Sequence, residues 1–225
     1  MKTLFIEARS DENIIPNKKD ISLLPKNIGI ITTVQHAHKI NELIEFLKKQ
    51  NKNPIIKKNK QKYPGQILGC DVSNAELIKD KVDCFLYIGS GNFHPIEAAL
   101  KTDKKVYCYN PLSRVFSKVN ENEVERYKKR IKGAKIRFLS SKEIGVLISV
   151  KPGQYNLEKA KKLKEKYKDK NFYFLIFDTL RKEELENFNF IECFVNTACP
   201  RIAEDELNKA VINIEDIDQF LNIQG

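Results

Sequence analysis

Residues 84–95 read CFLYIGSGNFHP, and this stretch decides the fold class. The five residues Cys84–Ile88 are apolar without interruption, as in a strand that is covered on both faces of a parallel sheet. A glycine-rich loop follows, and Pro95 suits the first position of a helix. A strand, a loop and a helix in this order form the repeating unit of α/β proteins. The stretch therefore predicts an α/β fold with a mainly parallel sheet.

The same order of elements recurs on both sides of this stretch. Further apolar runs predict strands at Thr3–Ala8, Ile28–Thr33, Pro54–Lys57, Lys105–Tyr109, Val146–Val150, Phe172–Phe177 and Ile191–Val195. Glu121–Leu139 reads as a long charged helix that is interrupted at Gly133. We therefore predict two consecutive three-layer α/β domains with mainly parallel sheets, residues 1–140 and 141–225, with a boundary near residue 140.

The composition is that of a globular protein, with 41% hydrophobic residues in a chain of 225. No apolar run approaches the roughly 20 residues of a membrane helix, and the start lacks the features of a secretory signal. We expect a cytoplasmic protein without a membrane partner. The 40 basic and 30 acidic residues give a net charge of +10, but only seven of the 40 are Arg. We attribute this excess to compositional drift toward Lys, and we do not expect nucleic-acid binding.

The five cysteines fall into two groups. Their odd number and wide spacing, in a chain without a leader, favour free thiols or metal ligands over disulfides. The first group, Cys84, Cys108 and Cys193, lies within apolar runs and is expected to be inert core. Cys70 and Cys199 instead lie among small and polar residues in predicted loops. Chemistry is therefore expected at these two thiols.

The loop around Cys70 is the first candidate site. Ser73 and Glu76 have the spacing of a capping box, which predicts a helix that starts directly after the cysteine. The field of a helix N-terminus favours a thiolate, and thus a reactive thiol or a cluster ligand. A small residue packed at a turn is an equally good interpretation of Cys70.

The loop Gly89–Pro95 is the second candidate, because its backbone N–H groups could cradle an anion. His94 would add a titratable or hydrogen-bonding group, although a plain N-cap role suits it as well. Basic residues occur in two more loops after strands, Lys151-Pro152-Gly153-Gln154 and Asn196-Thr197-Ala198-Cys199-Pro200-Arg201. Lys151 and Arg201 could bind a carboxylate or phosphate there, or simply be solvated.

Two weaker features complete the candidates. His36 and His38 form an H-x-H pair, but they fall where a helix begins, and helical residues two apart diverge. A metal site at this pair is therefore the less favoured interpretation. Residues 58–65 form a basic loop that we expect to be mobile.

Taken together, four motifs resemble the archaeal diphthamide synthase family. They are Gly69-Cys70-Asp71, Gly89-Ser90-Gly91-Asn92-Phe93-His94-Pro95, Lys151-Pro152-Gly153-Gln154 and Asn196-Thr197-Ala198-Cys199-Pro200-Arg201. The stretches Glu7-Ala8-Arg9-Ser10 and Thr32-Thr33-Val34-Gln35-His36 resemble the opening of that family's middle domain. The resemblance covers nearly the whole chain, and it rests on the set of motifs rather than on any one of them.

The resemblance implies an unconventional radical enzyme. In the family, three similar α/β domains each give one cysteine to a 4Fe-4S cluster that engages S-adenosylmethionine. The aminocarboxypropyl group of that cofactor is then transferred to a histidine of translation elongation factor two. Carried over, Cys70 and Cys199 would be cluster ligands, and both would face one cleft. Bordering that cleft, Gly89, Gly91, His94, Gln154 and Arg201 would bind the cofactor, and no catalytic residue can be assigned.

One departure from the family governs the expected activity. The chain begins where the family's second domain begins, so we expect the first domain's cysteine to be absent from it. A homologous cysteine-bearing subunit or a homo-oligomer would then complete the ligand set. Two alternatives remain open: a non-catalytic accessory or scaffold subunit, and an unrelated small-molecule α/β enzyme that uses the Gly89–His94 loop for a phosphate.

Overall fold

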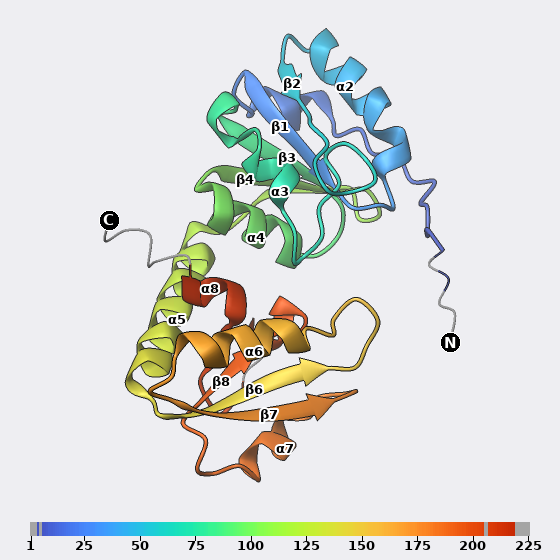
Figure 1. Cartoon of the computed structure of the whole chain (residues 1–225). Helices are drawn as coiled ribbons and strands as arrows, with labels where there is room; N and C mark the ends of the chain where they lie inside the picture. Colours follow the sequence, from blue (N-terminus) through green and yellow to red (C-terminus); the bar gives the residue numbers. More distant parts are fainter. Residues whose placement is uncertain (1–3, 5, 205–206, 219–225) are drawn as a thin grey trace. The chain divides into compact units, whose positions relative to one another are not determined.

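The computed structural model describes residue 4, residues 6–204 and residues 207–218 (Figure 1). The chain divides into two compact units, Met1–Glu125 and Arg126–Gly225. Each unit contains one β-sheet with helices packed against it. The predicted α/β fold class, with mainly parallel sheets, is thereby confirmed.

The first unit is built on a five-stranded sheet with the order β2-β1-β3-β4-β5. Its strands are β1 (Asn27–Thr32), β2 (Asn53–Ile55), β3 (Cys84–Ile88), β4 (Lys105–Asn110) and β5 (Val115–Lys118). The first four strands are parallel, and β5 returns antiparallel to β4. Its helices are α1 (Lys18–Ser22), η1 (Ala37–Lys39), α2 (Ile40–Lys49), α3 (Ser73–Glu76), η2 (Lys79–Lys81) and α4 (Phe93–Thr102).

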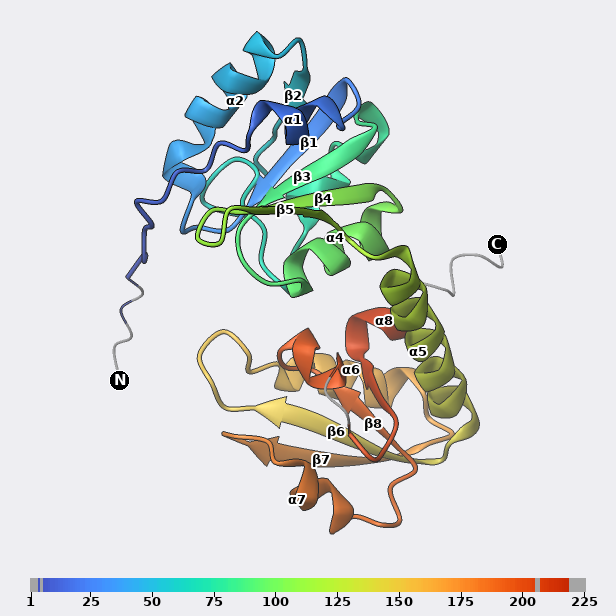
Figure 2. The same ribbon diagram turned by 180° about the vertical axis from the view of Figure 1, so that it is seen from behind.

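Two apolar layers cover this sheet. On one face Ile21 of α1 and Leu43 of α2 pack over β1 and β3, and on the other Ala75 of α3 and Ala98 of α4 do so. Figures 1 and 2 show these helix pairs on opposite faces of the sheet. Every residue of β3 is buried, as its unbroken apolar sequence predicts.

The second unit is built on a parallel four-stranded sheet with the order β7-β6-β8-β9. Its strands are β6 (Glu143–Ser149), β7 (Asn171–Phe177), β8 (Cys193–Asn196) and β9 (Val211–Asn213). Its helices are α6 (Leu157–Lys166), α7 (Lys182–Glu186), η3 (Pro200–Glu204) and α8 (Ile214–Asp218), and α5 (Glu121–Ser140) leads into it. Phe138, Leu163 and Ile217 cover one face of the sheet, and Leu185 packs on the other.

One predicted strand is wrong. Leu4 and residues 6–8 of the expected strand Thr3–Ala8 have no strand pairing, while Thr3 and Phe5 lie outside the described residues. Leu4 is 81% exposed and Ile6 is 84% exposed, so the apolar side chains that suggested a strand are not covered. The remaining predicted strands are present, with ends that shift by at most a few residues.

The helix α5 also departs from the prediction, because it continues through Gly133 without interruption. A glycine inside a helix costs only about 1 kcal/mol relative to alanine, and Ala134 and Phe138 of the same helix pack into the second core. The division between the two units falls within this helix, after Glu125. Among the helices of the described residues, none combines the length and the apolar character that crossing a bilayer needs.

Candidate functional site

Cys70 lies at the tip of a tight turn. The backbone N–H of Leu68 donates to the oxygen of Asp71 (2.9 Å), and the N–H of Asp71 donates back to the oxygen of Leu68 (3.1 Å). Gly69 and Cys70 are thus the two central residues of a closed turn, and Cys70 is exposed. The segment before the turn pairs with the end of β1, because Ile67 N–H donates to Thr32 O (2.8 Å). The thiol therefore lies at the carboxyl edge of the sheet, where parallel sheets place their sites.

The capping box predicted after Cys70 does not form. The helix α3 is a single turn that starts at Ser73, and Val72 precedes it without a side-chain cap. Instead, Asp71 Oδ1 accepts the N–H of Ser73 (2.9 Å), and Asp71 Oδ2 accepts Gln61 Nε2 (2.7 Å). Burial alone would raise the pKa of Asp71, but the hydrogen bonds from Ser73 and Gln61 outweigh it and lower the pKa. The tight turn and the hydrogen bonds of the neighbouring Asp71 carboxylate, and not a helix N-terminus, therefore position Cys70.

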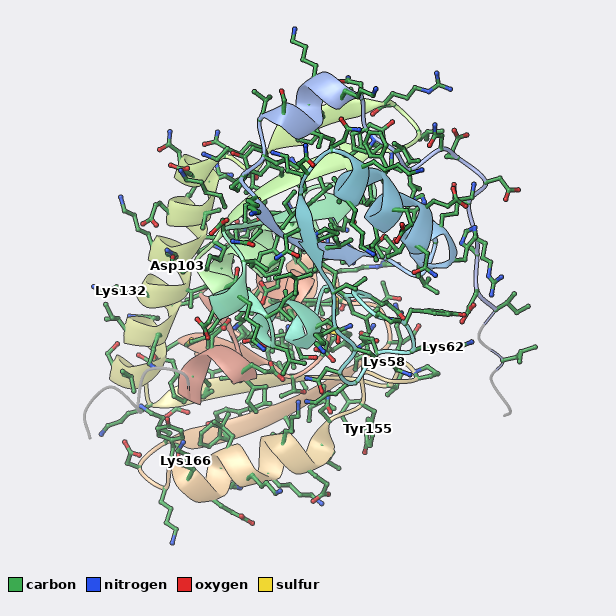
Figure 3. The ribbon with its side chains drawn as sticks, turned by 90° about the horizontal axis from the view of Figure 1, so that it is seen from above. Lys58, Lys62, Asp103, Lys132, Tyr155 and Lys166 are labelled. Carbon is green, nitrogen blue, oxygen red and sulfur yellow. The ribbon has the colours of Figure 1, made fainter. Side chains whose placement is uncertain are left out.

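Asn74 anchors the basic loop 58–65 beside this turn. Its side chain is 1% exposed, and its amide donates to the oxygens of Gln66 (2.6 Å) and Tyr63 (3.4 Å). The same end of the loop contacts Glu7, which accepts from Lys62 Nζ (2.6 Å) and from the hydroxyl of Tyr63 (2.9 Å). Figure 3 labels Lys58 and Lys62 on this loop. The loop expected to be mobile is therefore well supplied with hydrogen bonds.

The loop after β3 has the predicted position but a different helix start. The helix α4 begins at Phe93 with Asn92 at the N-cap position, so Pro95 is its third residue and His94 is not the cap. Gly89 N–H donates to Tyr109 O (3.0 Å), which ties the loop to the end of β4. Gly91 has a φ of 75°, a conformation that favours glycine. Pro95 has no N–H and the N–H of Ile96 donates to Asn92 O (3.0 Å), so an anion cradle at the start of α4 would use the N–H groups of Phe93 and His94.

His94 belongs to a small aromatic group. Its ring stacks on Tyr87 at 6.1 Å between centroids, and Phe93 meets it edge-on at 5.6 Å. Burial lowers the pKa of His94, so the imidazole is neutral near pH 7. A neutral imidazole offers one hydrogen-bond donor and one acceptor to a ligand and no full charge.

The His36 and His38 side chains lie in different surroundings, since His36 is buried and His38 is exposed. The described residues contain no group of three or more His, Cys, Asp or Glu side chains that could hold a metal ion. Burial lowers the pKa of His36, which makes it a neutral core histidine.

In the second unit, Cys199 lies in a loop that buried polar side chains organise. Asn196 is 1% exposed; its amide nitrogen donates to Cys199 O (2.8 Å) and to Asn213 Oδ1 (2.8 Å), and its oxygen accepts Ala198 N–H (3.0 Å). The hydroxyl of Thr197 donates to Leu147 O (2.8 Å). Cys199 itself is half-buried, and its thiol is not in a disulfide.

Asn156 is a site residue that sequence reasoning missed. It occupies the N-cap position of α6 but makes no capping bond. Its amide instead donates to Thr197 O (2.6 Å) and to Gln154 O (3.3 Å), which joins the Lys151–Gln154 turn to the Cys199 loop. An asparagine before a helix predicts a helix cap, so the sequence pattern does not reveal that Asn156 connects the two loops by hydrogen bonds.

The predicted ligand-binding residues of this unit differ in exposure. Gln154 is half-buried and closes a turn through its N–H to Lys151 O (3.0 Å), whereas Lys151 is exposed. Arg201 is exposed on η3, directly after the Cys199 loop.

The three remaining cysteines are buried, and burial raises the pKa of Cys84, Cys108 and Cys193 to about 12. The expected burial of these three cysteines in the core is confirmed.

The sequence matches the family model for diphthamide synthesis proteins over residues 1–223. The chain belongs to this family. The 2-(3-amino-3-carboxypropyl)histidine synthases of Pyrococcus horikoshii and Methanocaldococcus jannaschii are 29% and 30% identical to it, over 99% and 98% of the chain. The chain spans 66% and 62% of the length of these two relatives.

Solved structures of the diphthamide synthesis family show the same fold. Dph2 from Pyrococcus horikoshii matches with a TM-score of 0.79 and 29% identity, over 93% of this chain and 61% of that one. The same protein with a 4Fe-4S cluster matches with a TM-score of 0.78 and 30% identity, over 92% of this chain and 60% of that one. The family match excludes the alternative of an unrelated small-molecule enzyme.

Proposed function

We propose that this chain takes part in the first step of diphthamide synthesis, with Cys70 and Cys199 as two thiolate ligands of a 4Fe-4S cluster. The reaction is the transfer of the aminocarboxypropyl group of S-adenosylmethionine to a histidine of translation elongation factor two. Relatives named as 2-(3-amino-3-carboxypropyl)histidine synthases support the reaction, and the Dph2 structure with a 4Fe-4S cluster supports the cofactor.

The single observation that carries this proposal is the division of the cysteines. Cys84, Cys108 and Cys193 are buried with strongly raised pKa values, so they are poor thiolate donors. Cys70 and Cys199 are not buried, and each is held in a loop at the carboxyl edge of its own sheet. Soft thiolates in fixed, accessible loops fit an iron–sulfur cluster, whose cysteines need only converge in space.

With the cluster bound, the chemistry that it supplies is cleavage of the bond between the sulfur and the γ-carbon of the methionine moiety. The chain's own residues would bind and orient S-adenosylmethionine. Arg201 suits the methionine carboxylate, because its guanidinium fork can bind both oxygens. The backbone of Gly89 and Gly91, the neutral imidazole of His94 and the amide of Gln154 would add uncharged hydrogen-bonding groups.

A further cysteine would come from a partner, either a homologous cysteine-bearing subunit or a second copy of the chain. Two thiolates are one fewer than the three that the family uses. The isolated chain should therefore hold substoichiometric iron, since a cluster held by two thiolates is open to oxygen and iron loss.

Anaerobic reconstitution tests the proposal against the alternative of a non-catalytic accessory subunit. The chain is reconstituted alone and together with a full-length homologue, and cleavage of S-adenosylmethionine is measured by chromatography. We expect cleavage with the homologue and a loss of it when the chain carries Cys70→Ala or Cys199→Ala. The homologue keeps the cluster cysteine of its first domain and carries alanines at its cluster cysteines in the two domains that correspond to this chain, so that it does not support cleavage by itself. Unchanged cleavage in both variants would favour the accessory role.

A further inference from the structure

The ring of Phe93 lies directly on the Cα of Gly69, the neighbour of Cys70 in the turn. A Cβ placed on Gly69 would come within 1.8 Å of Phe93 Cε1, and within 2.7 and 2.8 Å of Cδ1 and Cζ. Real Cβ atoms do not approach other atoms this closely. No residue larger than glycine therefore fits at position 69 while the ring of Phe93 keeps its place.

The need for glycine at position 69 comes from this contact and not from backbone conformation. Gly69 is not among the residues with positive φ. Gly91 and Gly153 show the opposite case, since both have positive φ and open space where a Cβ would lie. Gly69 is thus a packing glycine, and Phe93 is the side chain that it accommodates.

Phe93 also belongs to the loop that carries the predicted anion cradle. It is the first residue of α4, directly after Asn92, and its ring meets His94 edge-on. His94 stacks on Tyr87, whose hydroxyl donates to Ser90 O (3.3 Å). One continuous series of contacts therefore runs from the turn of Cys70 to the backbone of the Gly89–His94 loop.

We propose that Phe93 is a positioning residue for Cys70, which fixes the cysteine turn to the Gly89–His94 loop through its contact with Gly69. This inference rests on the proposed function, because the turn that Phe93 fixes would carry a cluster ligand. The two reciprocal hydrogen bonds of Leu68 and Asp71 close the turn, but they do not set its place on the sheet. The pairing of Ile67 with Thr32 sets that place along β1, and the half-buried ring of Phe93 adds a side-chain constraint from the loop after β3.

The test compares single and double variants by the alkylation rate of Cys70, with Cys199 in the other unit as an internal reference. Iodoacetamide labelling of the full chain is followed by peptide mass spectrometry. We expect Gly69→Ala and Phe93→Ala each to change the rate at Cys70 at least threefold relative to Cys199. We also expect the double variant Gly69→Ala/Phe93→Ala to undo much of the Gly69→Ala effect, since removing the ring makes room for the new methyl group.

Gly133→Ala is the matched control, because a Cβ there meets nothing within 4 Å and the substitution is chemically the same. Phe93→Leu keeps an apolar side chain and should fall between wild type and Phe93→Ala. Unchanged Cys70 rates in folded Gly69→Ala and Phe93→Ala chains, judged by circular dichroism, would overturn the positioning role. So would strictly additive effects in the double variant. The alkylation rates do not depend on iron. A failure of the positioning role can therefore be told apart from a failure of the proposed function, in which Cys70→Ala would leave the cluster unchanged.

Discussion

Replacing Asn196 by alanine should destabilise the second unit and loosen the loop of Cys199. Asn196 is 1% exposed, and its side chain makes three hydrogen bonds, to Cys199 O, Asn213 Oδ1 and Ala198 N–H, with lengths of 2.8, 2.8 and 3.0 Å. Each such bond contributes about 1 kcal/mol net. The free energy of unfolding of this unit should therefore fall by about 3 kcal/mol.

The buried cysteines allow the two units to be followed separately. Cys193 is 0% exposed in the second unit and Cys84 is 1% exposed in the first, so each thiol is alkylated only when its own unit opens. Pulsed alkylation across a urea series then gives one unfolding curve for each unit. Asn196→Ala should shift the Cys193 curve to lower urea and leave the Cys84 curve in place.

Asn208→Ala is the control for this experiment. Asn208 is exposed and donates to one side-chain oxygen, Glu186 Oε1 (2.6 Å). The Asn208→Ala substitution should therefore lower the free energy of unfolding of the second unit by no more than about 0.5 kcal/mol. In native buffer, Asn196→Ala should also speed alkylation of Cys199. A loss of stability below about 1 kcal/mol, with an unchanged rate at Cys199, would refute the role given to Asn196.

Three further outcomes are expected. Burial lowers the folded-state pKa of His94 below 6.5, so the first unit should have its full stability above pH 6.5 and should lose stability as the pH falls through the lowered pKa of the folded state. An NMR titration of the His94 ring checks this, and a midpoint at or above 6.5 would contradict it. The folded-state pKa of Asp71 lies below 3.8, so the free energy of unfolding of the first unit should fall less steeply between pH 5 and 2.5 in Asp71→Asn than in the wild type. Urea titrations over this pH range measure it, and an equally steep fall in the variant would contradict the role of Asp71. Gly133→Ala should raise the stability of α5 by about 0.5–1 kcal/mol, measured by thermal unfolding, and a decrease would show that Gly133 has a packing role.

The central strands were predictable because burial on both faces leaves an unbroken apolar run. Cys84–Ile88 was predicted to the residue for this reason. The sequence does not predict the short strands β5 and β9, since one is an antiparallel edge strand with mostly exposed residues and the other has only three residues. Thr3–Ala8 was over-predicted because apolar character alone does not supply a neighbouring strand.

The candidate cysteines were predictable from their surroundings in the sequence, but the way in which they are held was not. The pattern of Ser73 and Glu76 predicted a capping box, yet the carboxylate of Asp71 takes the N–H of Ser73 and the helix is a single turn. The contact between Gly69 and Phe93 joins residues far apart in the sequence, and a local pattern does not reveal it. The same holds for Asn156 and Thr197.

The most direct test of the central claim is the iron and sulfide content of the chain after anaerobic reconstitution with a cysteine-bearing homologue that lacks its own cluster cysteines in the two corresponding domains. The wild-type chain should complete a four-iron cluster with the thiolate–iron absorption band, and Cys70→Ala and Cys199→Ala should each lose most of the iron. Cys84→Ala removes a buried thiol, and the chain with this substitution should keep its iron. Full iron and sulfide in both Cys70→Ala and Cys199→Ala would contradict the claim that these two thiolates hold the cluster.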